Sequence, residues 1–366
     1  MASSRSLMAF DIVTIVFAAD LPLLDLQARS FARFLPPELV NRIHVTVNDP
    51  AAEAACVAHV ETMTRPLLGP LADRLIVRTA ETPAEAGPDG WMAQQAAKLA
   101  ISAEIEADNY LILDAKNHLI RPLRREDLFE GRRARWTMSR STSRMRRWMA
   151  NSRAFFGLEM PRRLKIPPSM PPFMVRTGVA RALVGEIEAR SGKPLGRFFA
   201  DHGNDMTEFM LYAAYLASLG KTKALVSATG VPQPAMRRAT PAAEGMPAFA
   251  ERLAEDGVWL LSVHRRRFLD LEEDRVSRAV LVDAWTRGLF DSREAAEAEV
   301  SRLTAFYQAL RGMPEMGNRR HLYMAKQAQA ADEEKKPSLW SRIRPHLRLF
   351  AMTYAIGFLL AVMFIA

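Results

Sequence analysis

Short hydrophobic runs and amphipathic stretches alternate over the first part of this 366-residue chain. Compact apolar runs bounded by turn residues predict strands that are buried on both faces. The predicted strands cover residues 7–17, 42–47, 75–77 and 110–114. Apolar positions at helical spacing predict helices over 23–35 and 91–106. Strands that alternate with helices in this way predict an α/β fold with a mostly parallel sheet flanked by helices.

The second half of the chain is less regular. Residues 121–172 contain many arginines and prolines and little periodicity, so we predict no regular element there. Farther along, the pattern predicts helices at 179–190, 205–219, 274–289 and 293–311, and a strand at 258–263. We expect one globular domain over 7–290, followed by a helical extension and polar linker over 291–346.

An apolar segment without any charge, Leu349–Ala366, ends the sequence. It just reaches the roughly 17–25 residues that span a bilayer core. Basic residues precede it and none follows, so we predict a single-pass anchor over 347–366 in a cell membrane, with the globular domain cytoplasmic. The alternative is a buried terminal core helix. At the N-terminus, Asp11 interrupts the first apolar run, which we therefore interpret as a strand and not as a signal peptide.

Composition and charge narrow the possible partners. The single cysteine, Cys56, excludes an internal disulfide and a cysteine-rich zinc site. A formal net charge of +9 favours anionic partners. The arginines of 121–153, with Trp136 and Trp148 among them, could bind single-stranded nucleic acid, but no nucleic-acid-binding signature accompanies them. Beside a membrane anchor, anionic headgroups or a lipid-linked diphosphate are favoured, and a solvated loop or lid is the plainer alternative.

Polar residues follow four of the predicted strands. Ligands of open α/β sheets bind at the carboxyl ends of strands, so these residues are candidates for a binding site. They are Asp20, Asn48-Asp49, the run Asp114-Ala115-Lys116-Asn117-His118, and His264-Arg265.

Three further features each have a functional and a structural interpretation. Trp91, Gln94, Gln95 and Lys98 share one helix face, which points either to a ligand or to solvent. Glu208 could bind or deprotonate a substrate hydroxyl, or it could complete a capping box with Asp205. His264 could reach a ligand at the end of its strand, or could be hydrogen-bonded under a loop.

The order of these elements resembles a group of bacterial GT-A-type glycosyltransferase-like proteins linked to polysaccharide synthesis. The resemblance covers roughly residues 10–290 and rests on GWMAQQAAKL, YLILDAKNHLIRP, EFMLYAAYL and LLSVHRR. The residues that match the group's helix and its Asp-x-Asp-type element are Trp91, Gln94, Gln95, Lys98, Asp114, Arg121 and Pro122. The resemblance implies a GT-A-like nucleotide-diphospho-sugar fold.

The resemblance also implies roles for individual residues. A sugar would pass from a nucleoside diphosphate sugar to a membrane-proximal glycan or lipid-linked acceptor. Asp114, Glu208 and His264 are the implied catalytic residues, and Asp114 and His264 are also the candidate ligands of a divalent metal, Mn²⁺ or Mg²⁺. The implied donor-binding residues are Asp20 and Asp49 beside the nucleoside, and Gln94, Gln95, Lys98 and Lys116 around the sugar and diphosphate.

One departure from the group's pattern bears on the metal. The second acidic position of the Asp-x-Asp element is Lys116, and an ammonium group repels a cation. Lys116 could neutralise the donor diphosphate without a metal, although Asn117 and His118 could still supply ligands. We therefore predict a glycosyltransferase, and keep two alternatives: a catalytically inactive membrane-surface scaffold with the same fold, or a nucleic-acid-binding protein that uses the arginine-rich segment.

Overall fold

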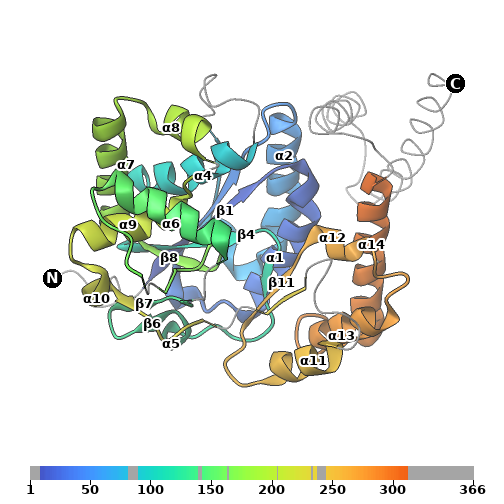
Figure 1. The fold of residues 1–366 in the computed structure, drawn as a ribbon. Coiled ribbons are helices and arrows are strands. Elements are labelled where there is room, and N and C mark those ends of the chain that lie inside the picture. The colour runs from blue at the N-terminus through green and yellow to red at the C-terminus, as the bar shows by residue number, and fades with distance from the viewer. Residues whose placement is uncertain are drawn as a thin grey trace, which may run out of the picture.

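A five-stranded sheet in the order β3-β2-β1-β4-β8 forms the centre of the molecule (Figure 1). The computed structural model describes residues 9–80, 90–138, 142–162, 165–203, 205–231, 234–236 and 245–311. The strands of the sheet are β1 (Phe10–Val16), β2 (Val40–Val47), β3 (Leu75–Thr79), β4 (Asn109–Asp114) and β8 (Phe173–Arg176). Strands β1 to β4 are parallel and β8 is antiparallel to β4, which confirms the predicted α/β fold with a mostly parallel sheet.

The order of the strands creates a switch point beside β1. The chain adds β2 and then β3 on one side of β1, and returns to add β4 on the other side. In sheets of this kind the crevice for a ligand opens where the strand order reverses, outside the carboxyl ends of the strands. In this chain that position lies between the ends of β1 and β4.

Strand β1 shows why the sheet lies in the middle of the protein. Its sequence, FDIVTIV, is buried along the whole length. Ile12 and Val16 pack into one hydrophobic core and Val13 and Ile15 into another, because successive side chains of a strand point to opposite faces. A strand with apolar residues on both faces requires a helical layer on each side.

Helices supply these two layers (Figure 1). One face of the sheet is covered by α1 (Leu21–Phe34) and α2 (Glu53–His59), with the single turn α3 (Arg65–Leu67) behind them. The other face is covered by α4 (Gly90–Ala100), α7 (Thr177–Ser191), α8 (Leu195–His202) and α9 (Glu208–Ser218), and α6 (Ser143–Phe155) packs outside α9. Short helices α5 (Arg125–Leu128) and α10 (Thr222–Leu225) border this layer.

Four helices after residue 245 join the α1 side. They are α11 (Met246–Ala254), α12 (Arg265–Phe268), α13 (Arg275–Thr286) and α14 (Arg293–Arg311). Trp285 and Val300 belong to the same hydrophobic core as α1. The Tyr307 hydroxyl donates to the Ala19 carbonyl at 3.0 Å, so α14 is tied to the chain that follows β1. The domain boundary at 290 stays a prediction.

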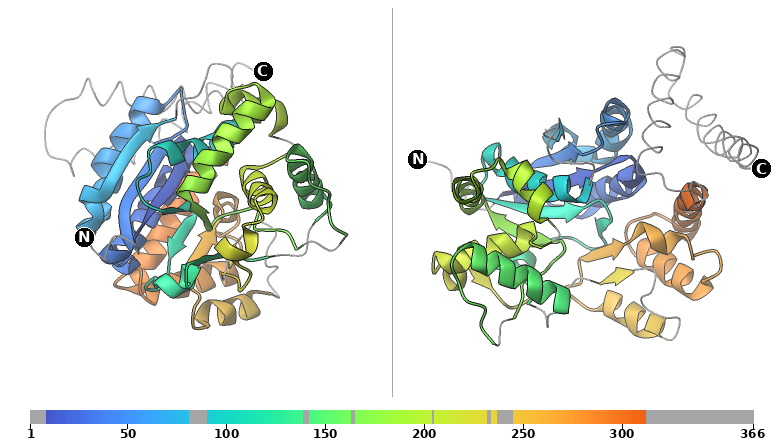
Figure 2. Two further views of the ribbon diagram at one scale, coloured as in Figure 1. Left: turned by 90° about the vertical axis from the view of Figure 1, so that its left-hand side faces the viewer. Right: turned by 45° about the horizontal axis from the view of Figure 1, so that its top comes forward.

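Two small sheets complete the fold. Strands β10 (Ala235–Met236), β11 (Leu260–Val263) and β5 (Asn117–Leu119) form one, and β6 (Phe129–Glu130), β7 (Arg133–Arg135) and β9 (Val226–Ser227) form the other. Strand β11 is antiparallel to β5, which directly follows β4. The right-hand view of Figure 2 shows this small sheet (yellow and orange strands) between the main sheet and the C-terminal helices. It brings residues near 264 to the end of β4.

Two predictions about local structure are wrong. No regular element was predicted within 121–172, but the short elements α5, β6 and β7 and the longer helix α6 all lie there. The Thr142 side chain caps α6 by accepting the Met145 N–H at 3.3 Å. Helix α9 begins at Glu208 and not at 205, because Thr207 is its cap and accepts the Met210 N–H at 3.4 Å. The capping-box interpretation of Glu208 is therefore also wrong.

The structure does not test the predicted membrane anchor. Within the described part of the chain, no helix is both long enough and apolar enough to cross a bilayer. The anchor at 347–366 and the linker that precedes it lie outside the described residues.

Candidate functional site

The switch point between β1 and β4 carries a carboxylate. Asp114 is the last residue of β4 and pairs in register with Ile15 of β1. Its side chain is 18% exposed, whereas the four strand residues before it are buried. The predicted position of Asp114, at the end of a buried strand beside the end of β1, is confirmed.

Two lysines hold this carboxylate. Lys116 Nζ donates to Asp114 Oδ2, and Lys98 Nζ of α4 lies 3.7 Å from Asp114 Oδ1. Lys98 also donates to Glu208 Oε1, at the start of α9, at 3.0 Å. Strand β4, helix α4 and helix α9 thus meet in a cluster of two cations and two anions, which we call the Lys98 cluster: Lys98, Asp114, Lys116 and Glu208.

The Lys98 cluster keeps Asp114 and Lys98 charged. Burial alone would raise the pKa of Asp114, but the ammonium groups of Lys116 and Lys98 outweigh this effect and lower the pKa to about 2. Burial alone would lower the pKa of Lys98, and the carboxylates of Glu208 and Asp114 raise it instead above its usual value. Asp114 is therefore an anion and Lys98 a cation at neutral pH, and neither is suited to exchanging protons there.

Gln95 and Lys98 point away from solvent, whereas Gln94 is half-buried. Gln95 and Lys98 are 1% and 5% exposed, so a solvated face is excluded for both. The Gln95 amide donates to the Gly203 carbonyl at 3.5 Å, in the loop before α9, and its own Oε1 has no hydrogen-bond partner. Gln94 donates to the Ile15 carbonyl at 3.5 Å, next to the end of β1. Of the predicted polar face, Lys98 and Gln94 are directed to the switch point.

The two aspartates predicted beside the nucleoside have partners within the chain. Asp49 is buried, and its Oδ2 accepts the Ala18 N–H at 3.0 Å, which joins the ends of β2 and β1. Asp20 lies 3.7 Å from an Arg265 guanidinium nitrogen. These contacts shape the edge of the sheet, and a contact with a nucleoside stays a prediction for both residues.

His264 is placed near the same edge by β11. The Val263 N–H donates to the Lys116 carbonyl at 3.1 Å, so the residue that follows, His264, lies directly before α12 and close to the backbone of Lys116. His264 Nδ1 accepts the Arg266 N–H at 3.2 Å and thereby caps α12. The neighbouring Arg265 guanidinium lies over the Phe17 ring at 4.9 Å, just after β1.

A buried hydrogen-bond network supports the floor of the site. Asn117 Oδ1 accepts the Asp114 N–H at 2.7 Å, and its amide donates to Ser262 of β11. Gln27 of α1 donates to the carbonyls of Asp114 and Asn117 at 2.9 and 2.7 Å. These bonds fix the direction of the Asp114 side chain. The sequence gives no signal for Gln27, because its partners are 87 and 90 positions away.

Other predicted residues also have structural partners. His118 is fully buried, accepts the Trp285 indole N–H at 2.8 Å, and has its pKa lowered to about 3 by burial. Arg121 donates to the carbonyls of Leu253, Ala254 and Glu255 at the end of α11. Arg121 therefore stabilises the C-terminus of a helix.

The side chains around Asp114 are poorly suited to bind a divalent metal ion. Among the described residues, no group of three or more His, Cys, Asp or Glu side chains is arranged to hold a metal ion. Both oxygens of Asp114 face ammonium groups, and Asn117 and His118 are fully buried among their own partners. Hard cations require several oxygen ligands and are repelled by lysine.

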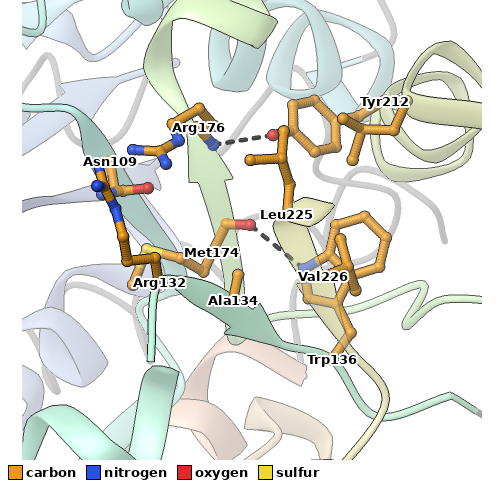
Figure 3. A pocket seen from close by; sticks show the side chains of 10 residues that line it. Asn109, Arg132, Ala134, Trp136, Met174, Arg176, Tyr212, Leu225 and Val226 are labelled. Atoms are coloured by element: carbon orange, nitrogen blue, oxygen red, sulfur yellow. Dashed lines mark hydrogen bonds between the residues drawn. The ribbon is translucent and has the colours of Figure 1, made fainter. Parts of the chain in front are cut away.

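A cavity with polar and aromatic walls lies at the opposite end of the sheet (Figure 3). It begins at Asn109, the first residue of β4, and its wall includes Arg176, whose N–H donates to the Tyr212 hydroxyl at 2.9 Å. It has room for roughly one water molecule, far less than a nucleotide sugar needs. This cavity is therefore not the candidate site.

Comparison with sequence models of protein families assigns this chain to a family. The sequence model of the family of unknown function DUF6492 matches residues 11–242. This chain belongs to that family. The match covers the main sheet, the Lys98 cluster and α6, and ends before α11.

Solved structures add little to this assignment. A crystal structure of S. aureus TarS is 12% identical, with a TM-score of 0.29, over 85% of this chain and 45% of that chain. A crystal structure of S. aureus TarS 1-349 is 12% identical, with a TM-score of 0.26, over 83% of this chain and 91% of that chain. The chain thus spans less than half the length of the first, and similarity at these scores carries no argument. No curated protein matches the chain.

Proposed function

We propose that this protein is a GT-A-like glycosyltransferase that takes a sugar from a nucleoside diphosphate sugar bound at the switch point. The observation that carries the proposal is the Lys98 cluster at the carboxyl ends of β1 and β4. Nucleotides bind at this position in doubly wound sheets. An aspartate flanked by lysines offers an acceptor for sugar or ribose hydroxyls and cations for phosphates.

Lys116 is the proposed partner of the diphosphate. Its side chain is 25% exposed and reaches Asp114 from only two residues away, so a rotation of the side chain can exchange Asp114 for a phosphate. When the bond between the anomeric carbon and the phosphate oxygen breaks, negative charge develops on the leaving diphosphate. A preorganised ammonium group stabilises that charge, and Arg265 can add to the same field.

Lys98 and Glu208 have a different proposed role. Both side chains are 6% exposed, and their hydrogen bond links α4 to α9. Glu208 therefore acts as a positioning residue for Lys98. For Glu208 to accept the proton of the attacking hydroxyl, as the sequence predicts, Lys98 would first have to move away. Asp114 then orients the donor, and the reaction needs no resident metal.

The proposed acceptor rests on the sequence prediction of an anchor and on no contact in the structure. A membrane-proximal glycan or lipid-linked acceptor is proposed because the predicted anchor would hold the domain at a cytoplasmic membrane surface. The arrangement of Asp114 between two lysines is equally compatible with the second candidate, an inactive scaffold of the same fold. Binding of a nucleotide sugar distinguishes the two.

A thermal-shift screen against nucleoside diphosphate sugars tests the proposal. We expect at least one sugar nucleotide to raise the Tm of the full chain in EDTA, since a ligand that binds only the folded state stabilises it. Lys116→Met should reduce the rise in Tm that the sugar nucleotide causes, and Asp114→Asn should alter the size of that rise. Matched controls are Lys223→Met and Asp73→Asn, which alter exposed residues outside the site and should leave the shift unchanged.

Two results would overturn parts of the proposal. No shift with any sugar nucleotide, with or without Mn²⁺, would favour the scaffold. A shift that appears only with Mn²⁺ would retain the donor but contradict metal-free binding.

A further inference from the structure

The positive charge of the protein is concentrated in one segment. Residues 131–165 contain ten arginines, one lysine and a single acidic residue, Glu159, whereas the rest of the chain has 39 basic and 40 acidic residues and is nearly neutral. The net charge of +9 is therefore a property of this segment and not of the whole surface. The segment includes α6, whose 13 residues contain no acidic side chain.

Helix α6 presents its arginines to solvent. Met149 and Ser152 are buried against the rest of the protein, while Arg144, Arg146 and Arg147 are exposed. Among the residues that the structure describes, no carboxylate lies within ion-pair distance of these three. Helix α6 is the outer helix of its layer, as Figure 1 and the left-hand view of Figure 2 show. Three exposed cations, spread over the outer half of α6, thus lie on the outside of the molecule without a carboxylate partner among the described residues.

Two tryptophans border these arginines. Trp148 of α6 and Trp91 at the start of α4 have ring centroids 6.3 Å apart, and Trp91 is 41% exposed. The Asn48 amide, just after β2, donates to the Gly90 carbonyl at 2.9 Å, so Trp91 lies at the edge of the sheet that carries the Lys98 cluster. We call the group the α6 surface: Trp91, Arg144, Arg146, Arg147 and Trp148.

We infer that the α6 surface binds the anionic face of a lipid bilayer. Arginines interact favourably with anionic headgroups, and tryptophan side chains lie preferentially at the membrane–water interface. The 35 residues from 312 to 346 separate the described fold from the predicted anchor and can extend to about 115 Å, so the anchor does not prevent α6 from reaching the bilayer. The edge of the sheet with the Lys98 cluster would then face the membrane.

Single-stranded nucleic acid is the other polyanion to consider. Its bases bind by stacking on open aromatic faces. The Arg144 guanidinium already lies over the Trp148 ring at 5.7 Å, and the two indoles pack against each other. This packing favours a lipid interface. The inference does not depend on sugar transfer, because a scaffold of the same fold would bind the bilayer in the same way.

Hydrogen exchange of the full chain in lipid nanodiscs tests the inference. The comparison is between neutral phosphatidylcholine discs and discs that contain phosphatidylglycerol, at low and high salt. We expect the amides of α6 and of the start of α4 to exchange more slowly in the anionic discs at low salt only. Because each arginine near an anionic surface changes binding by roughly fivefold, R144E/R146E/R147E should abolish this protection.

A matched variant controls for charge alone. R252E/R275E/R287E reverses three exposed arginines on or next to α11 and α13, far from α6, and should retain the protection. Equal exchange of α6 in neutral and anionic discs of the wild-type chain would overturn the inference, whether or not the variants fold. Protection of α6 by poly(U), with none from anionic discs, would assign the surface to nucleic acid instead.

Discussion

Removal of the Lys98 ammonium group should strongly destabilise the fold. Lys98→Met keeps the length and apolar stem of the side chain but leaves the buried Glu208 without the cation at 3.0 Å. Asp114 retains Lys116, so Glu208 alone loses its partner. At an effective dielectric constant of about 20 the lost attraction is about 5 kcal/mol, and breaking a buried pair typically costs about 3–5 kcal/mol.

A second substitution should reverse most of this loss. Glu208→Gln in the Lys98→Met background removes the stranded charge, so the double variant should be within about 2 kcal/mol of the wild type. Glu208→Gln alone leaves Lys98 with Asp114 at 3.7 Å and should cost only about 1–2 kcal/mol. The two substitutions should therefore be strongly non-additive, with a coupling energy of at least about 2 kcal/mol.

Equilibrium urea unfolding of the full chain measures these values. Lys223→Met, at an exposed position of α10, is the control and should change stability by less than about 0.5 kcal/mol. Additive effects, or a Lys98→Met variant within 1 kcal/mol of the wild type, would refute the structural argument for the Lys98 cluster.

Three further predictions concern the packing around the site. Burial lowers the pKa of His118 to about 3. Between pH 6.5 and 3, His118 is therefore protonated in the unfolded chain and neutral in the folded protein. The free energy of unfolding should then fall by up to about 1.4 kcal/mol for each pH unit toward acid. H118Q should flatten that slope in a series of urea unfolding curves; an unchanged slope would contradict it. A Cβ at Gly203 would lie 2.7 Å from the Phe199 carbonyl oxygen. G203A should therefore lower the free energy of unfolding by about 1–3 kcal/mol and lower the Tm in calorimetry. An unchanged Tm would show that the backbone shifts to accommodate the methyl group. Asn117→Ala removes the acceptor of the Asp114 N–H and should lower the free energy of unfolding by about 1–3 kcal/mol in chemical unfolding. An unchanged free energy would contradict the role of this hydrogen-bond network in supporting the site.

The sequence predicts the main sheet well because the strands that build it are apolar on both faces. The run ending at Asp114 is short, apolar and bounded by polar residues, which favours a buried strand. Its position beside β1 and not beside β3 is a feature of the tertiary structure that the sequence pattern does not specify. Helix α14 matches its predicted range, 293–311, because its apolar positions recur at helical spacing.

Other features depend on contacts between distant segments. Helix α6 was missed because arginines interrupt its apolar spacing, and its buried face exists only where it packs on α9. Lys98 could be placed on a helix, but its burial requires Glu208, 110 positions away. The role of Arg265 beside Asp20 also depends on β11 reaching the end of β4 through β5.

Photoaffinity labelling with an azido nucleoside diphosphate sugar shows whether the donor binds at the switch point between β1 and β4. We expect the label to attach to peptides at the carboxyl ends of β1, β4 and β11. Unlabelled sugar nucleotide should compete with it, and Lys116→Met should reduce it. Specific labelling confined to the depression between α13 and α14, lined by Arg275, Arg278 and Ser301, would contradict the assignment of the switch point as the donor site.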